Sequence, residues 1–244
     1  MVSSFHPHFG EESVLVGRYG SGTIFFTSCN LSCVYCQNYD ISQLRIGEEI
    51  SYERLAEMML ILQEKECHNI NLVTPTPQVP QIVKSLSLAA RKGLKIPLVY
   101  NTNAYDSVET IKLLRGIIDI YMPDAKYGDN ENALRYSSAP RYFETMKKAI
   151  KEMHKQVGDL MVNQEGIAQR GLLVRHLVLP ENIARSEKVF KFIAEEISPD
   201  TFINIMDQYY PSYKAHQYPQ LNKRISEQEY SQALELAKKA GLKK

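Results

Sequence analysis

The chain has 244 residues, 44% of them hydrophobic and 23% charged, which is ordinary for a soluble globular domain. Its formal net charge of +1 gives no electrostatic reason to expect nucleic acid or a membrane surface as a partner. The first residues lack the basic and apolar regions of a signal peptide, and no apolar stretch is long enough to span a bilayer. Four cysteines are too few for a secreted disulfide framework, so we expect a cytoplasmic protein.

Six apolar, β-rich runs predict strands, which in chain order are Gly22–Phe26, Ile70–Val73, Leu98–Tyr100, Ile117–Met122, Leu172–Leu179 and Phe202–Met206. Helical spacing predicts helices at Tyr52–Glu66, Gln78–Lys92, Ser107–Arg115, Arg141–Lys155, Ser186–Ile197 and Glu227–Ala240. Strands that alternate with helices predict βαβ units and a parallel sheet. Because a closed TIM barrel needs eight strands, six predict an α/β fold that is a partial barrel or an open sheet.

Three regions lack this periodicity: the first 20 residues, Tyr127–Pro140 and Gln208–Lys223. None is a long linker, so we expect a single domain over residues 1–244. It divides into an N-terminal segment (1–20), a six-strand core (21–207) and a C-terminal loop and helix (208–244). In parallel α/β folds the functional residues lie at the carboxyl ends of the strands, so the residues after each strand are the first candidates for a site.

Cys29, Cys33 and Cys36 follow the first predicted strand in one polar loop. Three thiolates are one short of a closed structural zinc site, which would have to recruit Cys67 or a histidine. On a four-iron cluster, three cysteines would leave one iron open to a small molecule. The spacing therefore leaves an iron–sulfur cluster and a zinc ion as alternatives. His6 and His8 likewise leave a metal-binding pair and a packed N-terminal lid as alternatives.

The segment CNLSCVYC resembles the CxxxCxΦC signature of radical S-adenosylmethionine (SAM) enzymes, in which Φ is aromatic. This resemblance implies a partial (β/α)6 TIM-like barrel, a [4Fe–4S] cluster on Cys29, Cys33 and Cys36, and SAM bound to the open iron. It also places Tyr35 beside the SAM adenine. The segments GSGTIFFTSCNLSCVYC, NTNAYDSVETIKLL and GLLVRHLVLPEN resemble the pyruvate formate-lyase activating enzyme group, in particular its uncharacterised activating enzyme-like branch.

The same resemblance implies that SAM is held by residues that follow the strands. After the second predicted strand the family has GGEP, and this chain has a neutral loop with Thr74 and Thr76, where Thr76 replaces the glutamate. After the third predicted strand, Asn101 and Asn103 match the family's DTNG. Their side chains could either bond SAM or cap the turn into the next helix, and both alternatives remain open.

Asp124 and Lys126 match the family's LDLK after the fourth predicted strand, and lie at alternate positions that share one side of an extended chain. On the fifth, Arg175 stands in an apolar run and needs an anionic partner, because an unpaired buried charge is costly. His176 points to the opposite face, as a packing histidine would. After the sixth, Gln208 replaces the histidine of the family's LPYH, so it can form hydrogen bonds but cannot titrate near neutral pH.

Together the resemblance implies a radical SAM oxidoreductase that cleaves SAM reductively to a 5′-deoxyadenosyl radical for hydrogen abstraction. Its subgroup implies a glycyl radical activase, with the glycine loop of a partner enzyme as substrate and flavodoxin or ferredoxin as electron donor. Lys126 and Arg175 are then candidate catalytic residues beside the cysteines. The alternative is a non-catalytic iron–sulfur or zinc protein, whose cysteines are structural or carry electrons.

Overall fold

The computed structural model describes residues 1–243. Its strands are β1 (Val2–His8), β2 (Ser21–Phe26), β3 (Ile70–Val73), β4 (Leu98–Thr102), β5 (Ile120–Pro123), β6 (Met161–Val162), β7 (Ala168–Leu177) and β8 (Phe202–Met206). Its α-helices are α1 (Ser13–Val16), α2 (Tyr39–Ser42), α3 (Tyr52–Glu64), α4 (Val79–Arg91), α5 (Val108–Leu113), α6 (Asn130–Ser137), α7 (Tyr142–Val157), α8 (Ser186–Glu196) and α9 (Glu227–Lys239). Short 3-10 helices are η1 (Thr76–Gln78), η2 (Pro180–Asn182) and η3 (Ala215–Gln217).

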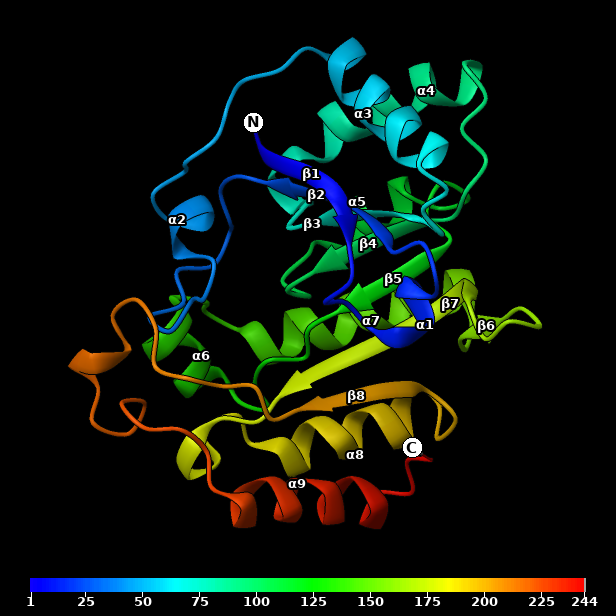
Figure 1. The fold of residues 1–244 in the computed structure, drawn as a ribbon. Coiled ribbons are helices and arrows are strands. Elements are labelled where there is room, and N and C mark those ends of the chain that lie inside the picture. The colour runs from blue at the N-terminus through cyan, green and yellow to red at the C-terminus, as the bar shows by residue number, and fades with distance from the viewer. Residues whose placement is uncertain (244) are drawn as a thin grey trace.

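Six strands form a continuous parallel array in the order β2-β3-β4-β5-β7-β8, and β1 is added antiparallel to β2. No pairing joins β1 to β8 within residues 1–243, so the curved sheet is not closed. Helices α3, α4, α7 and α8 lie around the outside of the sheet, and α9 lies beyond α8 (Figure 1). This confirms the predicted α/β fold, a partial barrel of parallel strands with outer helices.

The two faces of the sheet bury different sets of side chains, because neighbouring residues of a strand point to opposite faces. On β4, Tyr100 belongs to the main core under the helices, whereas Val99 belongs to a second apolar cluster. That second cluster also contains Ile120 and Leu173 from neighbouring strands and Leu15 from α1. Strands buried on both faces are nearly continuous in apolar residues, which is why they were recognisable in the sequence.

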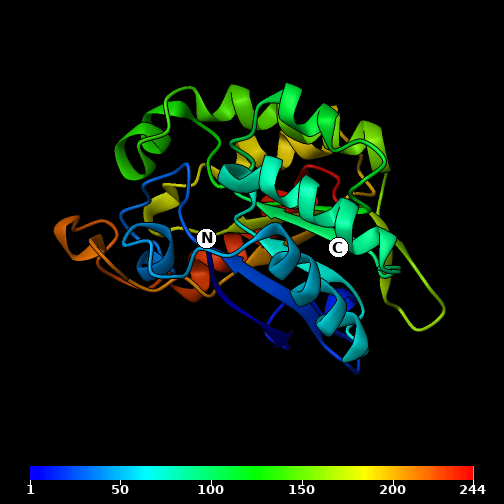
Figure 2. The same cartoon turned by 90° about the horizontal axis from the view of Figure 1, so that it is seen from above.

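The carboxyl ends of the parallel strands point to the left of Figure 1, where α2, α6 and the segment between β8 and α9 lie. Seen from above in Figure 2, the same three segments again gather at one end of the molecule. The β6–β7 hairpin lies at the opposite end (Figure 1). In parallel α/β folds, ligands bind at the carboxyl ends of the strands. In this protein, that end is covered by the loops that carry the candidate site residues.

Two of the regions without predicted strands or helices, the first 20 residues and Tyr127–Pro140, each contain a regular element. The N-terminal segment forms β1, where His6 stacks on Phe25 and His8 lies edge-on to the same ring, so these histidines pack on the sheet. Its mostly polar sequence gave little strand signal, since one edge pairing with β2 is enough to order it. The region Tyr127–Pro140 contains α6, whose first turn is capped by the Asp129 carboxylate accepting from the Asn132 amide at 2.8 Å.

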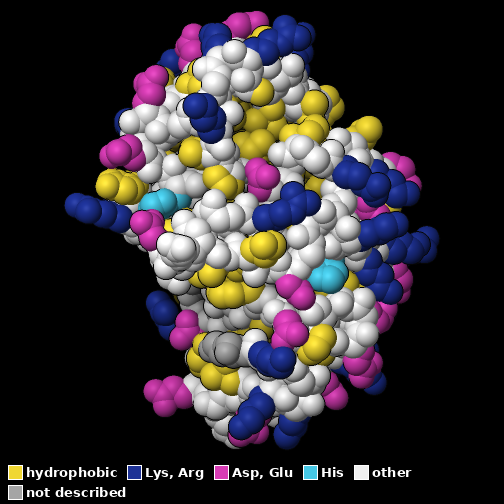
Figure 3. Space-filling model, turned by 90° about the vertical axis from the view of Figure 1, so that its right-hand side faces the viewer, with side chains coloured by type: hydrophobic (Ala, Val, Ile, Leu, Met, Phe, Trp, Pro, Cys, Tyr) yellow, Lys and Arg dark blue, Asp and Glu magenta, His cyan; other side chains and the backbone are white. Residues whose placement is uncertain are grey.

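The face of the molecule shown in Figure 3 carries Lys and Arg interspersed with Asp and Glu, and small apolar patches lie between them. This mixture agrees with a formal net charge of +1. Within residues 1–243, every helix is too short or too polar to traverse a lipid bilayer.

Candidate active site

A cavity of about 230 Å³ lies at the carboxyl ends of the strands. Eleven of the twelve residues predicted from the sequence line it: Cys29, Cys33, Tyr35, Cys36, Thr74, Asn101, Asn103, Asp124, Lys126, Arg175 and Gln208. They come from segments far apart in the chain, and parallel strands bring them together because the carboxyl ends meet at one edge. The twelfth, Thr76, does not line it.

The cysteine loop between β2 and α2 is held against the end of α6. The amide of Ser32 donates to the Ser137 carbonyl, and the amide of Val34 donates to the Tyr136 carbonyl, both at 2.9 Å. These bonds satisfy carbonyls in the last turn of α6 that have no partner within the helix. Because two backbone bonds fix the loop on either side of Cys33, its thiol has a defined position.

All three thiols are free, and each has a polar neighbour. The Cys29 sulfur accepts from the Asn103 side-chain amide at 3.3 Å, and the Cys33 sulfur accepts from the Ser137 hydroxyl at 3.0 Å. Cys36 Sγ lies 3.2 Å from Ser42 Oγ. Burial raises the pKa of the Cys33 thiol to about 12 and also raises the pKa of Cys29. A thiol of this kind loses its proton when a metal binds it.

The donor set fits a [4Fe–4S] cluster: three free thiols line one cavity, with hydrogen-bond donors directed at two of the sulfurs. No group of three or more His, Cys, Asp or Glu side chains in residues 1–243 is placed to hold a single metal ion. A four-iron cluster makes a different demand, because each thiolate binds a different iron and the fourth iron is left for another ligand.

Asp124 and Arg175 form the centre of a charged network in the same cavity. Arg175 Nε donates to Asp124 Oδ1 at 2.8 Å, and Lys126 Nζ donates to Asp124 Oδ2 at 2.7 Å. Burial alone would raise the pKa of Asp124, but the charges of Arg175 and Lys126 outweigh it and lower that pKa. Arg175 also donates to Asn101 Oδ1 at 2.8 Å and to Glu11 Oε2 at 3.2 Å. The anionic partner that the sequence required for Arg175 is therefore a pair of carboxylates.

Glu11 and Glu12 are two partly buried acidic residues that the sequence did not mark as candidates. They precede α1, and Glu11 joins the charged network through Arg175. Both oxygens of the Glu12 carboxylate accept from Asn204 Nδ2, at 2.9 and 2.8 Å, and burial raises the pKa of Glu12. Two adjacent acidic residues in a segment without periodicity carry no local signal of burial; only the tertiary path of the segment places them here.

Three residues at the strand ends around the cavity have positive φ although they are not glycine. They are Ser28 after β2 (φ 72°), Thr74 after β3 (φ 58°) and Ala104 after β4 (φ 63°). For a β-branched residue such as Thr74 this conformation is strained, and such strain gathers at functional sites. The Thr74 amide donates to the Asn101 carbonyl at 3.0 Å, which helps to hold the conformation.

Thr76 faces away from the cavity because its hydroxyl donates to the buried Asp106 carboxylate at 2.8 Å. Asp106 also accepts from the hydroxyls of Thr102 at 2.6 Å and Tyr100 at 3.0 Å. Burial raises the pKa of Asp106, and these three donors oppose that shift. The residue of this loop that does line the cavity is Thr74.

Asn103 caps the turn, which is one of the two roles expected for it, and it also bonds the cysteine loop. Its Oδ1 accepts from the Tyr105 amide at 2.9 Å, which caps the turn, and its Nδ2 donates to Cys29 Sγ and to Asn30 Oδ1. Gln208 lines the cavity on the far side, and its carbonyl accepts from Gln37 Nε2 at 3.3 Å. The loop after β8 is thereby joined to the cysteine loop.

His176 lies on the opposite face of β7 and is completely buried. Its Nδ1 bonds the Ala125 carbonyl at 2.7 Å, between Asp124 and Lys126, and its Nε2 bonds Ser186 Oγ at 2.9 Å. A carbonyl only accepts, so Nδ1 carries the proton. Burial lowers the pKa of this imidazole to about 4. His176 is thus a neutral packing histidine that fixes the end of β5.

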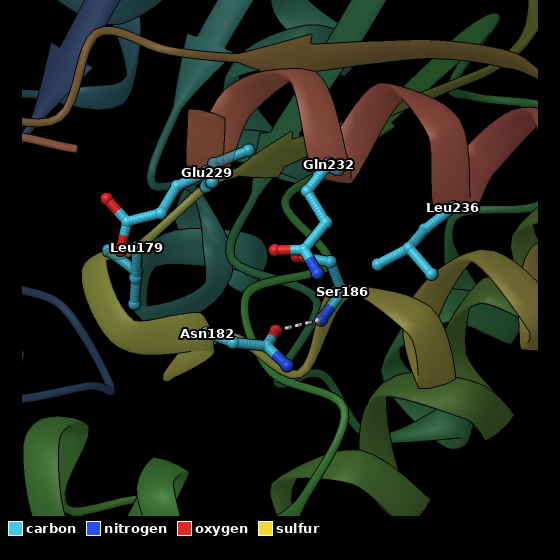
Figure 4. Close-up of a pocket in the computed structure, with 8 residues that line it drawn as sticks. Leu179, Asn182, Ser186, Glu229, Gln232 and Leu236 are labelled. Atoms are coloured by element: carbon cyan, nitrogen blue, oxygen red, sulfur yellow. Dashed lines mark hydrogen bonds between the residues drawn. The ribbon is translucent and has the colours of Figure 1, made fainter. Parts of the chain in front are cut away.

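A second, smaller cavity of about 50 Å³ lies between η2 and α9 (Figure 4). Asn182, Ser186 and Glu229 line it, and the Ser186 amide donates to Asn182 Oδ1 at 3.3 Å. None of the predicted site residues lies there.

Comparison with known proteins gives one family match and one curated relative. A family model described as Radical SAM superfamily matches residues 23–193. The chain is 38% identical to the uncharacterized protein MJ0674 of Methanocaldococcus jannaschii, over 96% of this chain and 66% of that protein, so it spans just under two thirds of that relative.

Three solved structures resemble this chain in fold, at low sequence identity. "Native anSMEcpe with bound AdoMet" matches with a TM-score of 0.58 and 16% identity, over 88% of this chain and 58% of that one. TYW1 with a lysine-pyruvate adduct bound has a TM-score of 0.58 and 13% identity, over 95% of this chain and 74% of that one. HydG, a maturase of the [FeFe]-hydrogenase, has a TM-score of 0.61 and 13% identity, over 94% of this chain and 52% of that one.

Proposed function

We propose that this chain, which belongs to the radical SAM superfamily, holds its cluster on Cys29, Cys33 and Cys36 and holds SAM at the ends of its parallel strands. A [4Fe–4S] cluster and SAM are the cofactors of that superfamily and of this chain. The observation that carries the proposal is that three free thiols line the same cavity as Asp124, Lys126 and Arg175. When bound, the reduced cluster and SAM supply a 5′-deoxyadenosyl radical for hydrogen abstraction, with methionine as the other product.

The residues around the thiols suit the polar groups of SAM. We assign the SAM carboxylate to the cationic side, where Lys126 and Arg175 line the cavity. Thr74 presents a hydroxyl for the SAM ammonium group, without the charge assistance that a carboxylate would give. Asn101 and Asp124 already bond Arg175, so they keep its guanidinium oriented while offering further hydrogen-bonding atoms.

Tyr35 and Gln208 are assigned to the adenosine part of SAM. Tyr35 is almost completely buried, lines the cavity, and packs edge-on against Tyr209 with ring centroids 5.9 Å apart. A fixed aromatic surface of this kind suits a planar base. Gln208 can donate and accept hydrogen bonds there without a change of charge, so it serves in binding and not in proton transfer.

The substrate that we propose is the glycine loop of a partner enzyme, with a flavodoxin or ferredoxin as electron donor. The proposal is supported by the likeness of the cysteine loop and of the strand ends to glycyl radical activases. β1 and β8 are not paired with each other within residues 1–243, so the sheet is unclosed between them, which suits entry of an extended loop.

The test is anaerobic reconstitution of the protein with iron and sulfide, followed by reduction with dithionite in the presence of SAM. We expect formation of 5′-deoxyadenosine and methionine. Cys33→Ala should lose the cluster and the products, whereas Cys67→Ala should keep both, because Cys67 is buried away from the cavity. A fully loaded wild-type cluster that yields neither product would support the alternative, a non-catalytic iron–sulfur or zinc protein.

A further inference from the structure

A chain of buried hydrogen bonds connects the tyrosine of the cysteine loop to one of the cysteine sulfurs. Tyr35 donates to the Tyr127 hydroxyl at 2.7 Å, and Tyr127 Oη lies 2.8 Å from Ser137 Oγ. Ser137 in turn donates to Cys33 Sγ at 3.0 Å. Tyr127 and Ser137 are completely buried, so solvent does not compete for their hydroxyls, and Tyr35 and Cys33 are only 5% and 8% exposed.

Counting protons gives this chain a single direction. Each hydroxyl has one hydrogen to donate. The hydrogen of Ser137 points at Cys33, so Ser137 must accept from Tyr127, and Tyr127 must accept from Tyr35. A cluster ligand is a thiolate, which only accepts, so the same direction holds with the cluster bound. The three donors therefore all point toward Cys33.

Donors aligned in one direction polarise one another, which strengthens each bond by about 10–30% in condensed-phase estimates. Hydrogen bonds to cysteine sulfurs are among the factors that set the potential of an iron–sulfur cluster. They stabilise negative charge on the sulfur, and the reduced cluster carries one electron more than the oxidised cluster. A donor chain that ends on Cys33 therefore favours the reduced state.

We propose that Ser137, supported by Tyr127 and Tyr35, raises the reduction potential of the cluster through its hydrogen bond to Cys33. This inference rests on the proposed function, since it requires a cluster bound at Cys33. It gives α6 a second role beside holding the cysteine loop, and it explains a tyrosine at position 35, because phenylalanine would supply the ring without the first donor. Ser137 is a positioning residue that acts through Cys33.

The test is an EPR-monitored redox titration of the reconstituted full chain. Ser137→Ala should lower the midpoint potential so that the ratio of reduced to oxidised cluster at a fixed potential falls about tenfold, which is about 59 mV for one electron. Tyr127→Phe should lower the potential less, because Ser137 still donates to Cys33, and Tyr35→Phe least. In the double variant Ser137→Ala/Tyr127→Phe the potential should equal that of Ser137→Ala, since Tyr127 acts only through Ser137.

The matched control is Ser85→Ala, which removes another completely buried helical serine, one that bonds the Gln81 carbonyl within α4 and touches no sulfur. It should leave the potential unchanged. Should Ser137→Ala bind no cluster, Tyr127→Phe decides the question alone. Loaded variants with the wild-type potential would overturn the inference while leaving the proposed function intact. A wild-type chain that binds no [4Fe–4S] cluster would instead overturn the proposed function, and the inference with it.

Discussion

Replacing His176 with glutamine is expected to remove a pH-dependent part of the protein's stability. The buried imidazole is neutral, with Nδ1 donating to the Ala125 carbonyl and Nε2 bonded to Ser186. Its pKa is about 4 in the folded protein, against an ordinary value of 6.5. In the pH window between these values the unfolded chain binds a proton that the folded chain does not, so stability falls as the pH falls.

The magnitude follows from the width of that window. Between pH 6.5 and pH 5 the difference is about 1.5 pH units, and each unit is worth about 1.36 kcal/mol. The wild type should therefore lose about 2 kcal/mol through His176 on going from neutral pH to pH 5. For a chain of this size that corresponds to a fall of about 4–8 °C in the midpoint of thermal unfolding.

Thermal unfolding of wild type and His176→Gln at pH 7 and pH 5 measures this effect. The wild type should lose about 4–8 °C more than the variant, because the other titrating groups are common to both. An NMR titration of the His176 ring gives the pKa directly. A midpoint near 6.5 in the NMR titration, or equal losses of unfolding temperature in the two proteins, would show that burial does not lower the pKa of His176.

Two further substitutions test the site, and a third serves as a control. Asp124→Ala removes the carboxylate paired with Lys126 and one of the two paired with Arg175, and should lower the free energy of unfolding by about 3 kcal/mol. Glu57→Ala, which breaks the exposed pair with Arg54, should cost less than about 1 kcal/mol; equal losses in urea denaturation would contradict a buried network. Thr74→Gly should stabilise the chain by about 1 kcal/mol, because glycine adopts a φ of 58° without strain. A lower unfolding midpoint for that variant would show that the Thr74 backbone is not strained.

The parts of the fold that the sequence predicted well are those with strong local signals. Strands such as β3 and β5 are buried on both faces, and their apolar runs are therefore nearly continuous. β1 was missed because it lies at an edge with mostly polar residues, and α6 because it is only 8 residues long. Short elements of this kind are ordered by tertiary contacts more than by their own propensity.

Some residues of the candidate site could be predicted from the sequence, and others could not. The cysteine loop and the residues after the strands could be found because they resemble the motifs of radical SAM enzymes, and because parallel strands bring their carboxyl ends to one edge. Glu11 and Ser137 could not, since each reaches the site through a tertiary path with no local signature. Thr76 was expected beside Thr74 in the cavity. It lies two residues further along the chain, and its hydroxyl donates to Asp106 instead. No periodicity predicts the direction of a residue in a 3-10 turn.

The central claim is that three thiols hold the cluster and leave one iron free for SAM. The most direct measurement is the EPR spectrum of the dithionite-reduced, fully loaded protein before and after addition of SAM. We expect SAM to change the g values of the cluster signal, and to do so equally in Cys67→Ala. A signal that SAM leaves unchanged, in protein shown to hold a complete [4Fe–4S] cluster, would show that SAM does not bind the cluster.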